Sequence, residues 1–287
     1  MVLVVGANGR IGTAVVQALV DKGQQVRAMV RDPQRSKITE GPNVELVVAD
    51  LAKPDSWEAA TKGVENIFLL SPESDQMAEL HGRFAAAAKG ADVRHLVRLS
   101  MLPANPDSPL AIGKWHGEAD RNVANSGLPY TILRSAYFMQ NLIGFARSIA
   151  SEGVFRGAMG DGKVGVIDTR DIGDVAATVL SSDGHEGKTY ILTGPEAFSM
   201  GELAVKLSTI LGKEVRYVNV TEADAKAGMM AMGMPDWMAD GWAKIALMVS
   251  TGAASTVTNH VQEITGQAPR SFDQFARDYA KAFNVTN

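Results

Sequence analysis

The chain has 287 residues, 46% hydrophobic and 21% charged, and no cysteine, so disulfides, thiolate nucleophiles and cysteine-held metal centres are excluded. Its net charge of −4 and its aromatic content of 6% argue against a nucleic-acid-binding protein, which typically carries a basic stripe or stacking aromatics. Because no apolar run approaches the roughly 18 residues that span a bilayer and no signal peptide is visible, we expect a soluble cytoplasmic protein with no membrane or nucleic-acid partner.

Short runs rich in β-branched residues alternate with longer amphipathic segments in the first half of the chain. The runs are apolar on both faces, as are strands of a parallel sheet covered by helices, and they lie at residues 2–5, 26–30, 44–49, 67–70, 95–100 and 130–134. Helical spacing is present at residues 11–22, 55–62 and 74–89. This alternation predicts an α/β fold with a Rossmann-like, doubly wound parallel sheet.

The pattern changes after residue 134. We predict helices over 135–151, 171–180, 199–211 and 271–283, a strand over 188–193, a glycine-rich turn region over 153–165 and a Met- and Ala-rich stretch over 222–254. Ser199 and Glu202 have the spacing of a capping box, and Gly212 stands where a glycine often ends a helix. We therefore predict a domain over residues 1–134, to which 166–195 return in part, and a smaller C-terminal α/β lobe over 196–287 with a contribution from 135–165.

A glycine motif joins the first predicted strand to the first predicted helix. In dinucleotide-binding domains the first such glycine allows a tight turn, the second lets the backbone approach a pyrophosphate, and the third lets the helix pack closely on the strand. Free N–H groups at the helix N-terminus attract the phosphates. We therefore predict that an NAD(P) cofactor is bound by residues of this motif, namely Gly6, Asn8, Gly9, Arg10, Ile11 and Gly12.

The residue that follows the second predicted strand bears on the choice of nicotinamide cofactor. NAD-binding proteins usually carry an acid near this position for the ribose 2′-hydroxyl, whereas this chain has Arg31, with Arg35 and Lys37 close behind. A guanidinium suits a 2′-phosphate and can stack on adenine, so we favour NADPH. Two alternatives stay open: Asp32 can reach a ribose hydroxyl itself, and the segment can be a solvated loop of mixed charge.

Three further candidates lie at the carboxyl ends of predicted strands, where open α/β sheets bind their ligands. Asp50 and Leu51 end the third strand and Ser71 ends the fourth. We expect them to line the adenine and ribose sites. The structural alternatives are that Asp50 caps the following helix and that Ser71 only makes a turn.

The Gly-x-x-Gly-x-x-Gly spacing resembles that of the extended and atypical short-chain dehydrogenase/reductases, whose carbonyl reductases use a Tyr with a Lys four residues on. None of the five tyrosines has a Lys at that spacing. Reducing a simple ketone produces an alkoxide, which an acid must protonate. A quinone that accepts hydride becomes a delocalised anion, and a carbocationic dye becomes neutral, so both acceptors need positioning more than protonation. The missing pair argues against epimerase or alcohol dehydrogenase chemistry but not against hydride transfer.

Longer stretches resemble the NmrA-like atypical short-chain dehydrogenase/reductases, and within them the branch of type 2 NAD(P)H:quinone oxidoreductases and triphenylmethane reductases. They span most of the chain and comprise residues 4–12, 30–33, 95–100, 126–134, 171–172, 187–195 and 266–275, together with Asn141. The resemblance implies NADPH as the cofactor and hydride transfer to quinone-like or cationic dye-like acceptors. It also implies that His116 falls where some relatives keep a Lys, although Lys114 is the alternative equivalent.

Four residues are candidates for the catalytic site. His116 can donate a proton or orient an acceptor, and Lys114 is the neighbouring alternative; either can instead be a helix-surface residue. Ser100, at the carboxyl end of its strand, is placed to bind a substrate oxygen or the nicotinamide ribose. Tyr137, followed by Phe138, suits the wall of a flat acceptor, with core packing as the alternative. The five histidines are scattered, so we predict no metal site.

The Met-rich stretch near Trp237 and Trp242 has two interpretations. It is a helical core or a dimer contact, or else a deformable lid over a planar apolar acceptor, because methionine adapts to irregular ligands. A homodimer is left open.

We therefore predict an NADPH-dependent oxidoreductase that transfers hydride directly to a quinone-like or other conjugated acceptor, a planar small molecule covered by the C-terminal lobe. The alternatives are a non-catalytic NADP-binding redox sensor or regulator and, more weakly, a reductase of imine, enone or nitro groups in specialised metabolites.

Overall fold

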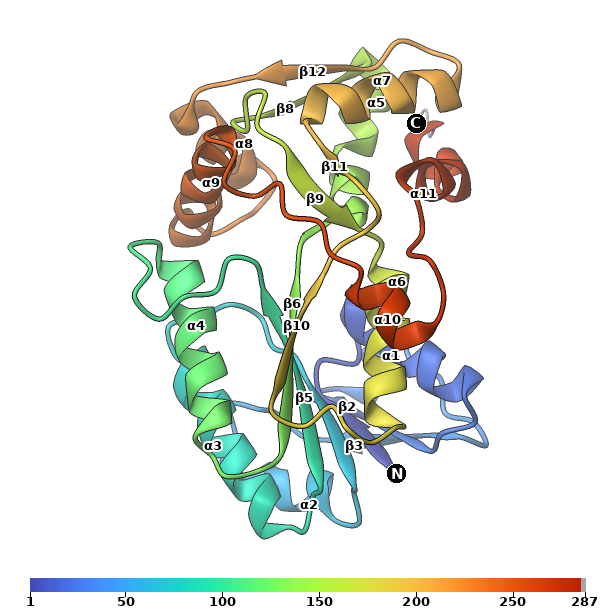
Figure 1. Ribbon diagram of the computed structural model, residues 1–287, viewed down its shortest axis with the longest axis vertical. Helices are drawn as coiled ribbons and strands as arrows, with labels where there is room; N and C mark the ends of the chain where they lie inside the picture. The colour runs from blue at the N-terminus through green and yellow to red at the C-terminus, as the bar shows by residue number, and fades with distance from the viewer. Residues whose placement is uncertain (285–287) are drawn as a thin grey trace. The chain divides into compact units, whose positions relative to one another are not determined.

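The computed structural model describes residues 1–284, which form two compact units (Figure 1). The first unit comprises Met1–Ser135, Thr169–Leu192 and His260–Gln267, and the second comprises Ala136–Asp168, Thr193–Asn259 and, of the described residues, 268–284. Residues 260–267 thus belong to the first unit, although they lie inside the range that the sequence assigned to the smaller lobe. None of the helices among residues 1–284 is long and apolar enough to cross a membrane.

The first unit is built on a seven-stranded parallel sheet with the order β10-β6-β5-β4-β1-β2-β3. The chain starts at β1, winds outward through β2 and β3, and then returns to wind outward in the other direction, which is the doubly wound topology. The predicted fold class is therefore confirmed. The strands are β1 (Val2–Val4), β2 (Val26–Val30), β3 (Val44–Val48), β4 (Asn66–Leu69), β5 (His95–Met101), β6 (Tyr130–Ser135) and β10 (Lys188–Leu192).

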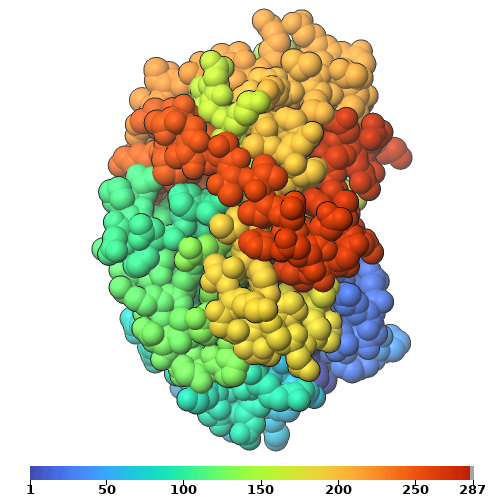
Figure 2. Space-filling view, viewed as in Figure 1, coloured from blue at the N-terminus to red at the C-terminus, as the bar shows by residue number. Residues whose placement is uncertain are grey.

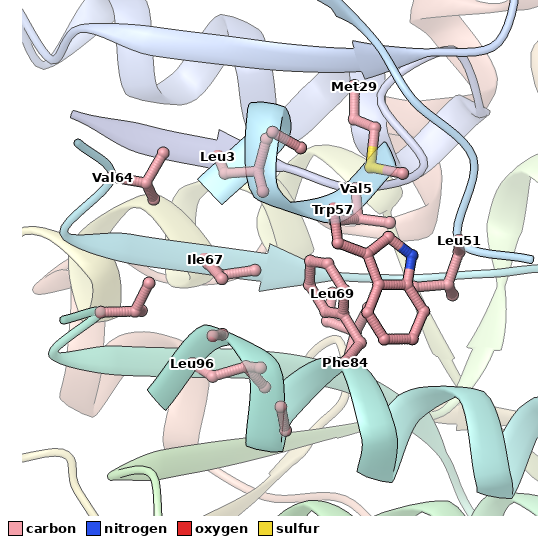
Figure 3. Packing of buried hydrophobic residues seen from close by; sticks show 14 of the residues in the cluster. Leu3, Val5, Met29, Leu51, Trp57, Val64, Ile67, Leu69, Phe84 and Leu96 are labelled. Atoms are coloured by element: carbon pink, nitrogen blue, oxygen red, sulfur yellow. The ribbon is translucent and has the colours of Figure 1, made fainter. Parts of the chain in front are cut away.

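Helices cover both faces of this sheet (Figure 1). One layer is formed by α1 (Arg10–Asp21), α6 (Thr169–Leu180) and α10 (His260–Thr265), and the other by α2 (Trp57–Thr61), α3 (Met77–Gly90) and α4 (Ala111–Ala124). The side chains of α10 lie directly against the segment that holds α6 and β10 (Figure 2). Under α2 and α3, Trp57 and Phe84 meet edge to face with ring centroids 5.3 Å apart, over strand residues such as Ile67 (Figure 3).

The second unit contains two small sheets and several helices around an aromatic core. One sheet has the order β11-β9-β7 and the other pairs β12 with β8. Its core gathers Phe155, Phe272, Phe275 and Phe283. The strands are β7 (Tyr137–Phe138), β8 (Val154–Gly157), β9 (Val164–Ile167), β11 (Ala197–Phe198) and β12 (Arg216–Asn219), and the helices are η3 (Met139–Phe145), α5 (Ala146–Glu152), α7 (Met200–Leu211), α8 (Glu222–Ala231), α9 (Asp236–Ser250), α11 (Phe272–Asp278) and η4 (Ala280–Asn284).

The second unit departs from the sequence prediction at residues 135–151 and 153–165, and it also contains β11 and β12, which were not predicted. The helix predicted over 135–151 begins as β7 and continues as a 3-10 helix before α5, because Tyr137 and Phe138 pair with Val166 and Ile167 of β9. The predicted turn region over 153–165 contains β8 and the start of β9, and β8 pairs with a strand about 60 residues later in the sequence. By contrast, the capping box of Ser199 is present at α7.

Candidate functional site

The glycine motif forms the turn between β1 and α1. Gly6 has a φ of +79°, and a Cβ there would lie 2.6 Å from the carbonyl oxygen of Leu70; a Cβ on Gly12 would lie 2.1 Å from the carbonyl oxygen of Gly6. Both positions therefore require glycine for the fold itself. A Cβ on Gly9 would meet only the Gly6 oxygen, at 3.3 Å, and no side chain caps α1 at this residue. The space at Gly9 is thus left open beside an uncapped helix N-terminus, as a bound phosphate requires.

The segment after β2 is tied to the glycine motif by Asn8. The side-chain oxygen of Asn8 accepts hydrogen bonds from the Ser36 hydroxyl at 3.1 Å and from the Lys37 backbone N–H at 3.0 Å. These bonds hold the basic loop against the turn that is predicted to bind the pyrophosphate. The loop begins at Arg31 and includes the 3-10 helix η1 (Pro33–Arg35).

Within this loop, the acid and the bases have different roles. The Asp32 carboxylate accepts the Gln34 N–H at 3.0 Å and caps η1, so one of its oxygens serves the local structure. Arg31, Arg35 and Lys37 are exposed, and none of the three forms an ion pair within residues 1–284. The loop therefore offers three available cations and a partly engaged carboxylate, which suits a phosphate better than a ribose hydroxyl.

The candidates that follow β3 and β4 are engaged in local structure. A carboxylate oxygen of Asp50 accepts the N–H of Ala52 at 3.0 Å, and the Asp50 carbonyl accepts the indole N–H of Trp57 at 3.2 Å. Leu51 is buried. The Ser71 hydroxyl lies 2.8 Å from Nε2 of His81. Asp50 therefore stabilises the turn after β3 and does not cap the following helix, whose N-cap is Lys53, and Ser71 is part of a larger polar network.

A fully buried arginine, Arg98, lies in β5 at the centre of that network. Its guanidinium forms an ion pair with Asp120 of α4, donates from Nε to Nδ1 of His81 on α3 at 2.9 Å, and faces Nδ1 of His116 on α4 with Nη2 at 3.4 Å. Burying a guanidinium is tolerated only where a countercharge and hydrogen-bond acceptors surround it. All three partners lie on the two helices that cover this face of the sheet.

Asp120 connects this arginine to the carboxyl ends of β5 and β6. Its second oxygen accepts the Ser100 hydroxyl at 3.1 Å and the Nε–H of Arg134 at 3.0 Å. The cluster thus contains two arginines and one carboxylate, which gives it one net positive charge when the histidines are neutral.

Both histidines of the cluster are neutral at physiological pH. Burial, reinforced by the positive charge of Arg98, lowers the pKa of His116 to about 3, and the same causes hold the pKa of His81 well below its usual value. Burial lowers the pKa of Arg98 to about 10, against the opposing effect of Asp120, so this guanidinium stays charged. His116 is therefore a neutral imidazole with 6% of its surface exposed.

The structure brings together some of the predicted catalytic residues but not all. His116 and Ser100 both belong to the Arg98 cluster. Lys114 lies on α4 with half of its side chain exposed and pairs with Glu118 at 3.9 Å, outside the cluster. Tyr137 belongs to the second unit, where it packs against that unit's core.

Sequence reasoning missed Arg98, Asp120, His81 and Arg134. A signal was available for the first of these, because an arginine inside an otherwise apolar run predicted to be a buried strand must have a countercharge nearby.

The comparisons with known proteins agree with this architecture. The model of the NmrA-like family matches residues 1–270. The chain belongs to the NmrA-like family. Among its relatives, the NAD(P)H azoreductase of Xenophilus azovorans is 38% identical, with 99% of this chain and 100% of that protein covered.

Two solved structures extend the likeness to three dimensions. The NADPH-dependent quinone oxidoreductase QOR2 of Escherichia coli, complexed with NADPH, has a TM-score of 0.87 at 32% identity, covering 97% of this chain and 99% of that one. Triphenylmethane reductase of Citrobacter sp., complexed with NADP(H), has a TM-score of 0.85 at 27% identity, covering 98% and 100%. The NmrA-like membership and the resemblance to quinone and dye reductases are therefore confirmed.

Proposed function

We propose that this chain is an NADPH-dependent oxidoreductase that transfers hydride directly to quinone-like or other conjugated acceptors. The support from relatives is consistent: those named above are an azoreductase, a quinone oxidoreductase and a triphenylmethane dye reductase. All three reduce conjugated acceptors according to their names, and the two solved structures contain NADPH or NADP(H).

The glycine motif and the basic loop fit the two charged parts of NADPH. The open space at Gly9 and the uncapped start of α1 suit the pyrophosphate. Arg31, Arg35 and Lys37 suit the 2′-phosphate, while Asp32 is partly engaged in capping. When bound, NADPH supplies a hydride; a quinone that takes this hydride together with one proton from water leaves as the hydroquinone.

The observation that carries the choice of acceptor is the character of the polar groups at the ends of β5 and β6. Near the end of β5 lie the neutral imidazole of His116, carried by α4, and the Ser100 hydroxyl, which donates to Asp120; no tyrosine of the chain has a lysine four residues on that would activate it. A neutral imidazole with a pKa of about 3 is a poor proton donor at pH 7, because its ionised form is scarcely populated. Acceptors whose reduced form delocalises the new charge are those that such a site serves.

The proposal is tested by following the near-ultraviolet absorbance of NADPH with a panel of acceptors. The panel contains a benzoquinone, a naphthoquinone, a cationic triphenylmethane dye and an azo dye, with an unconjugated ketone as the control. We expect turnover with one or more conjugated acceptors and none with the ketone. Tight NADPH binding without turnover on any acceptor would favour the sensor alternative instead.

A further inference from the structure

Arg98 constrains where the proton lies on two neighbouring imidazoles. A guanidinium has only N–H donors and no acceptor, so a histidine nitrogen that faces it must be unprotonated. Nδ1 of His81 faces Nε of Arg98 at 2.9 Å, and Nδ1 of His116 faces Nη2 of the same side chain at 3.4 Å. A neutral imidazole holds one proton, which in both rings must therefore lie on Nε2.

The contacts of His81 agree with this assignment. Its Nε2–H donates to the Ser71 hydroxyl at 2.8 Å, and that hydroxyl donates in turn to the carbonyl oxygen of Pro72 at 3.1 Å. Every donor in this chain of hydrogen bonds finds an acceptor, from Arg98 in β5 to the loop after β4. The reverse tautomer would place two donors face to face at Nδ1.

His116 differs from His81 because its Nε2 has no hydrogen-bond partner among residues 1–284. Every buried side-chain nitrogen or oxygen of the described chain has a partner, so this Nε2 reaches an accessible surface although the residue is only 6% exposed. One edge of the ring is thus held by Arg98, and the other edge presents a single N–H. Its neighbour in the cluster, Ser100, is the last residue but one of β5, close to the sheet edge where ligands of this fold bind.

The charged groups around His116 oppose its protonation. Arg98 faces it from β5, neutral His81 lies on α3, and Asp120 lies one turn along its own helix α4. The carboxylate of Asp120 is shared between Arg98 and Arg134 of β6, so it leaves one net positive charge in the cluster rather than a counter-ion for an imidazolium. This agrees with the low pKa of His116.

We propose that Arg98 is a positioning residue that holds His116 as a neutral hydrogen-bond donor, presenting Nε2–H to an oxygen of the bound ligand. This rests on the proposed function, under which the oxygen belongs either to the carbonyl of the acceptor or to the nicotinamide riboside of the cofactor. On an acceptor carbonyl, His116 then stabilises the developing negative charge without giving up its proton, and on the nicotinamide riboside it orients the cofactor. The proton that completes a hydroquinone comes from water.

A pair of substitutions separates the donor from the ring. In His116→Gln the side-chain amide reaches the position of Nε2 with an N–H donor, whereas the shorter His116→Asn places its amide near the position of Nδ1. We expect His116→Gln to keep kcat/KM for a naphthoquinone within about 3-fold, and His116→Asn to lose about 100-fold, the usual loss when one aligned donor is removed. Equal losses in both variants would overturn the proposal.

The same pair identifies which oxygen is bound. If the oxygen belongs to the acceptor, His116→Asn lowers kcat/KM for the quinone while the Kd for NADPH is unchanged. If it belongs to the nicotinamide riboside, the Kd for NADPH rises in His116→Asn and not in His116→Gln. The Kd is measurable by NADPH fluorescence even if no acceptor is turned over, and an unchanged Kd together with unchanged turnover in His116→Asn would overturn the proposal.

The tautomer is tested without any activity by ¹⁵N NMR of the imidazoles in the wild-type chain between pH 4 and 8. We expect His116 to show a protonated Nε2 and an unprotonated Nδ1 throughout, with no titration near the ordinary histidine pKa. A protonated Nδ1, or a titration near that pKa, would overturn the proposal. If this tautomer is found but NADPH is oxidised by none of the acceptors, the proposed function fails while the role of Arg98 stands.

Discussion

The glycine motif makes a prediction that separates the demands of folding from those of the cofactor. Gly9 has φ −74° and ψ 162°, an ordinary extended conformation for any residue, and its Cβ would meet one atom at 3.3 Å. We therefore expect Gly9→Ala to change the free energy of unfolding by less than about 1 kcal/mol, since alanine also reduces the entropy of the unfolded chain. Gly12→Ala, with a backbone oxygen 2.1 Å from the new Cβ, is the contrasting variant that we expect to be severely destabilised or not to fold.

The cofactor affinity of Gly9→Ala should fall although its fold is intact. The added methyl group occupies the space through which a phosphate approaches the backbone N–H groups at the start of α1. Losing one charged hydrogen bond costs about 1.5–3 kcal/mol, which corresponds to a roughly 10- to 100-fold higher Kd for NADPH. Urea unfolding measures the stability and NADPH fluorescence measures the Kd. A folded Gly9→Ala variant that binds NADPH as tightly as the wild type would refute the assignment of this loop to the pyrophosphate.

Three further predictions concern the basic loop and the buried cluster. Arg31→Ala should raise the KM for NADPH by about 10-fold, because it removes one charge-assisted contact of about 1.4 kcal/mol, and should change the KM for NADH by less than about 2-fold. Steady-state kinetics with both cofactors measure the two values, and an equal rise in both would contradict the assignment of Arg31 to the 2′-phosphate. Asp120→Asn should destabilise the fold by about 3–5 kcal/mol, because it leaves the buried Arg98 without its countercharge; a urea midpoint equal to that of wild type would contradict this. Folding lowers the pKa of His116 to about 3, whereas in the unfolded chain this pKa is near 6.5. Between these two pH values the unfolded chain binds more protons than the folded chain, so the folded state loses stability as the pH falls from about 6.5 towards 3. At pH 5 this one histidine accounts for a loss of about 2 kcal/mol, and unfolding curves at pH 7 and 5 should show a smaller loss in His116→Gln.

The fold of the first unit was predictable because its signals are local. The buried strands are short and mostly apolar runs, and the glycine motif stands at the turn where Gly6 and Gly12 are required by close backbone contacts. The second unit was less predictable because its strands are short and pair with distant segments. Tyr137 and Phe138 form a strand only because β9 offers them a partner, and nothing in the sequence around them indicates this.

In the candidate site too, the features with local sequence signals were predictable and those that depend on distant segments were not. His116 and Ser100 were found as separate candidates, from the resemblance and from a strand end. They are connected by Asp120, whose two oxygens join Arg98 to Ser100 and Arg134. This connection runs through β5, α4 and β6, and no fixed spacing of residues in the sequence indicates that these three elements meet. The neutrality of His116 likewise depends on burial and on a guanidinium from another strand, so a proton donor and a neutral hydrogen-bond donor were indistinguishable from the sequence.

The central claim, direct hydride transfer from NADPH to a conjugated acceptor, is tested most directly by a single turnover with NADPH deuterated stereospecifically at C4. We mix the cofactor-loaded chain with a naphthoquinone and follow the nicotinamide absorbance. The account predicts that oxidation occurs, that it is slowed by deuterium on one face of the nicotinamide and not on the other, and that its rate is independent of pH between 6 and 8. Bound NADPH that no conjugated acceptor oxidises, or oxidation without any isotope effect on either face in this single turnover, would contradict it.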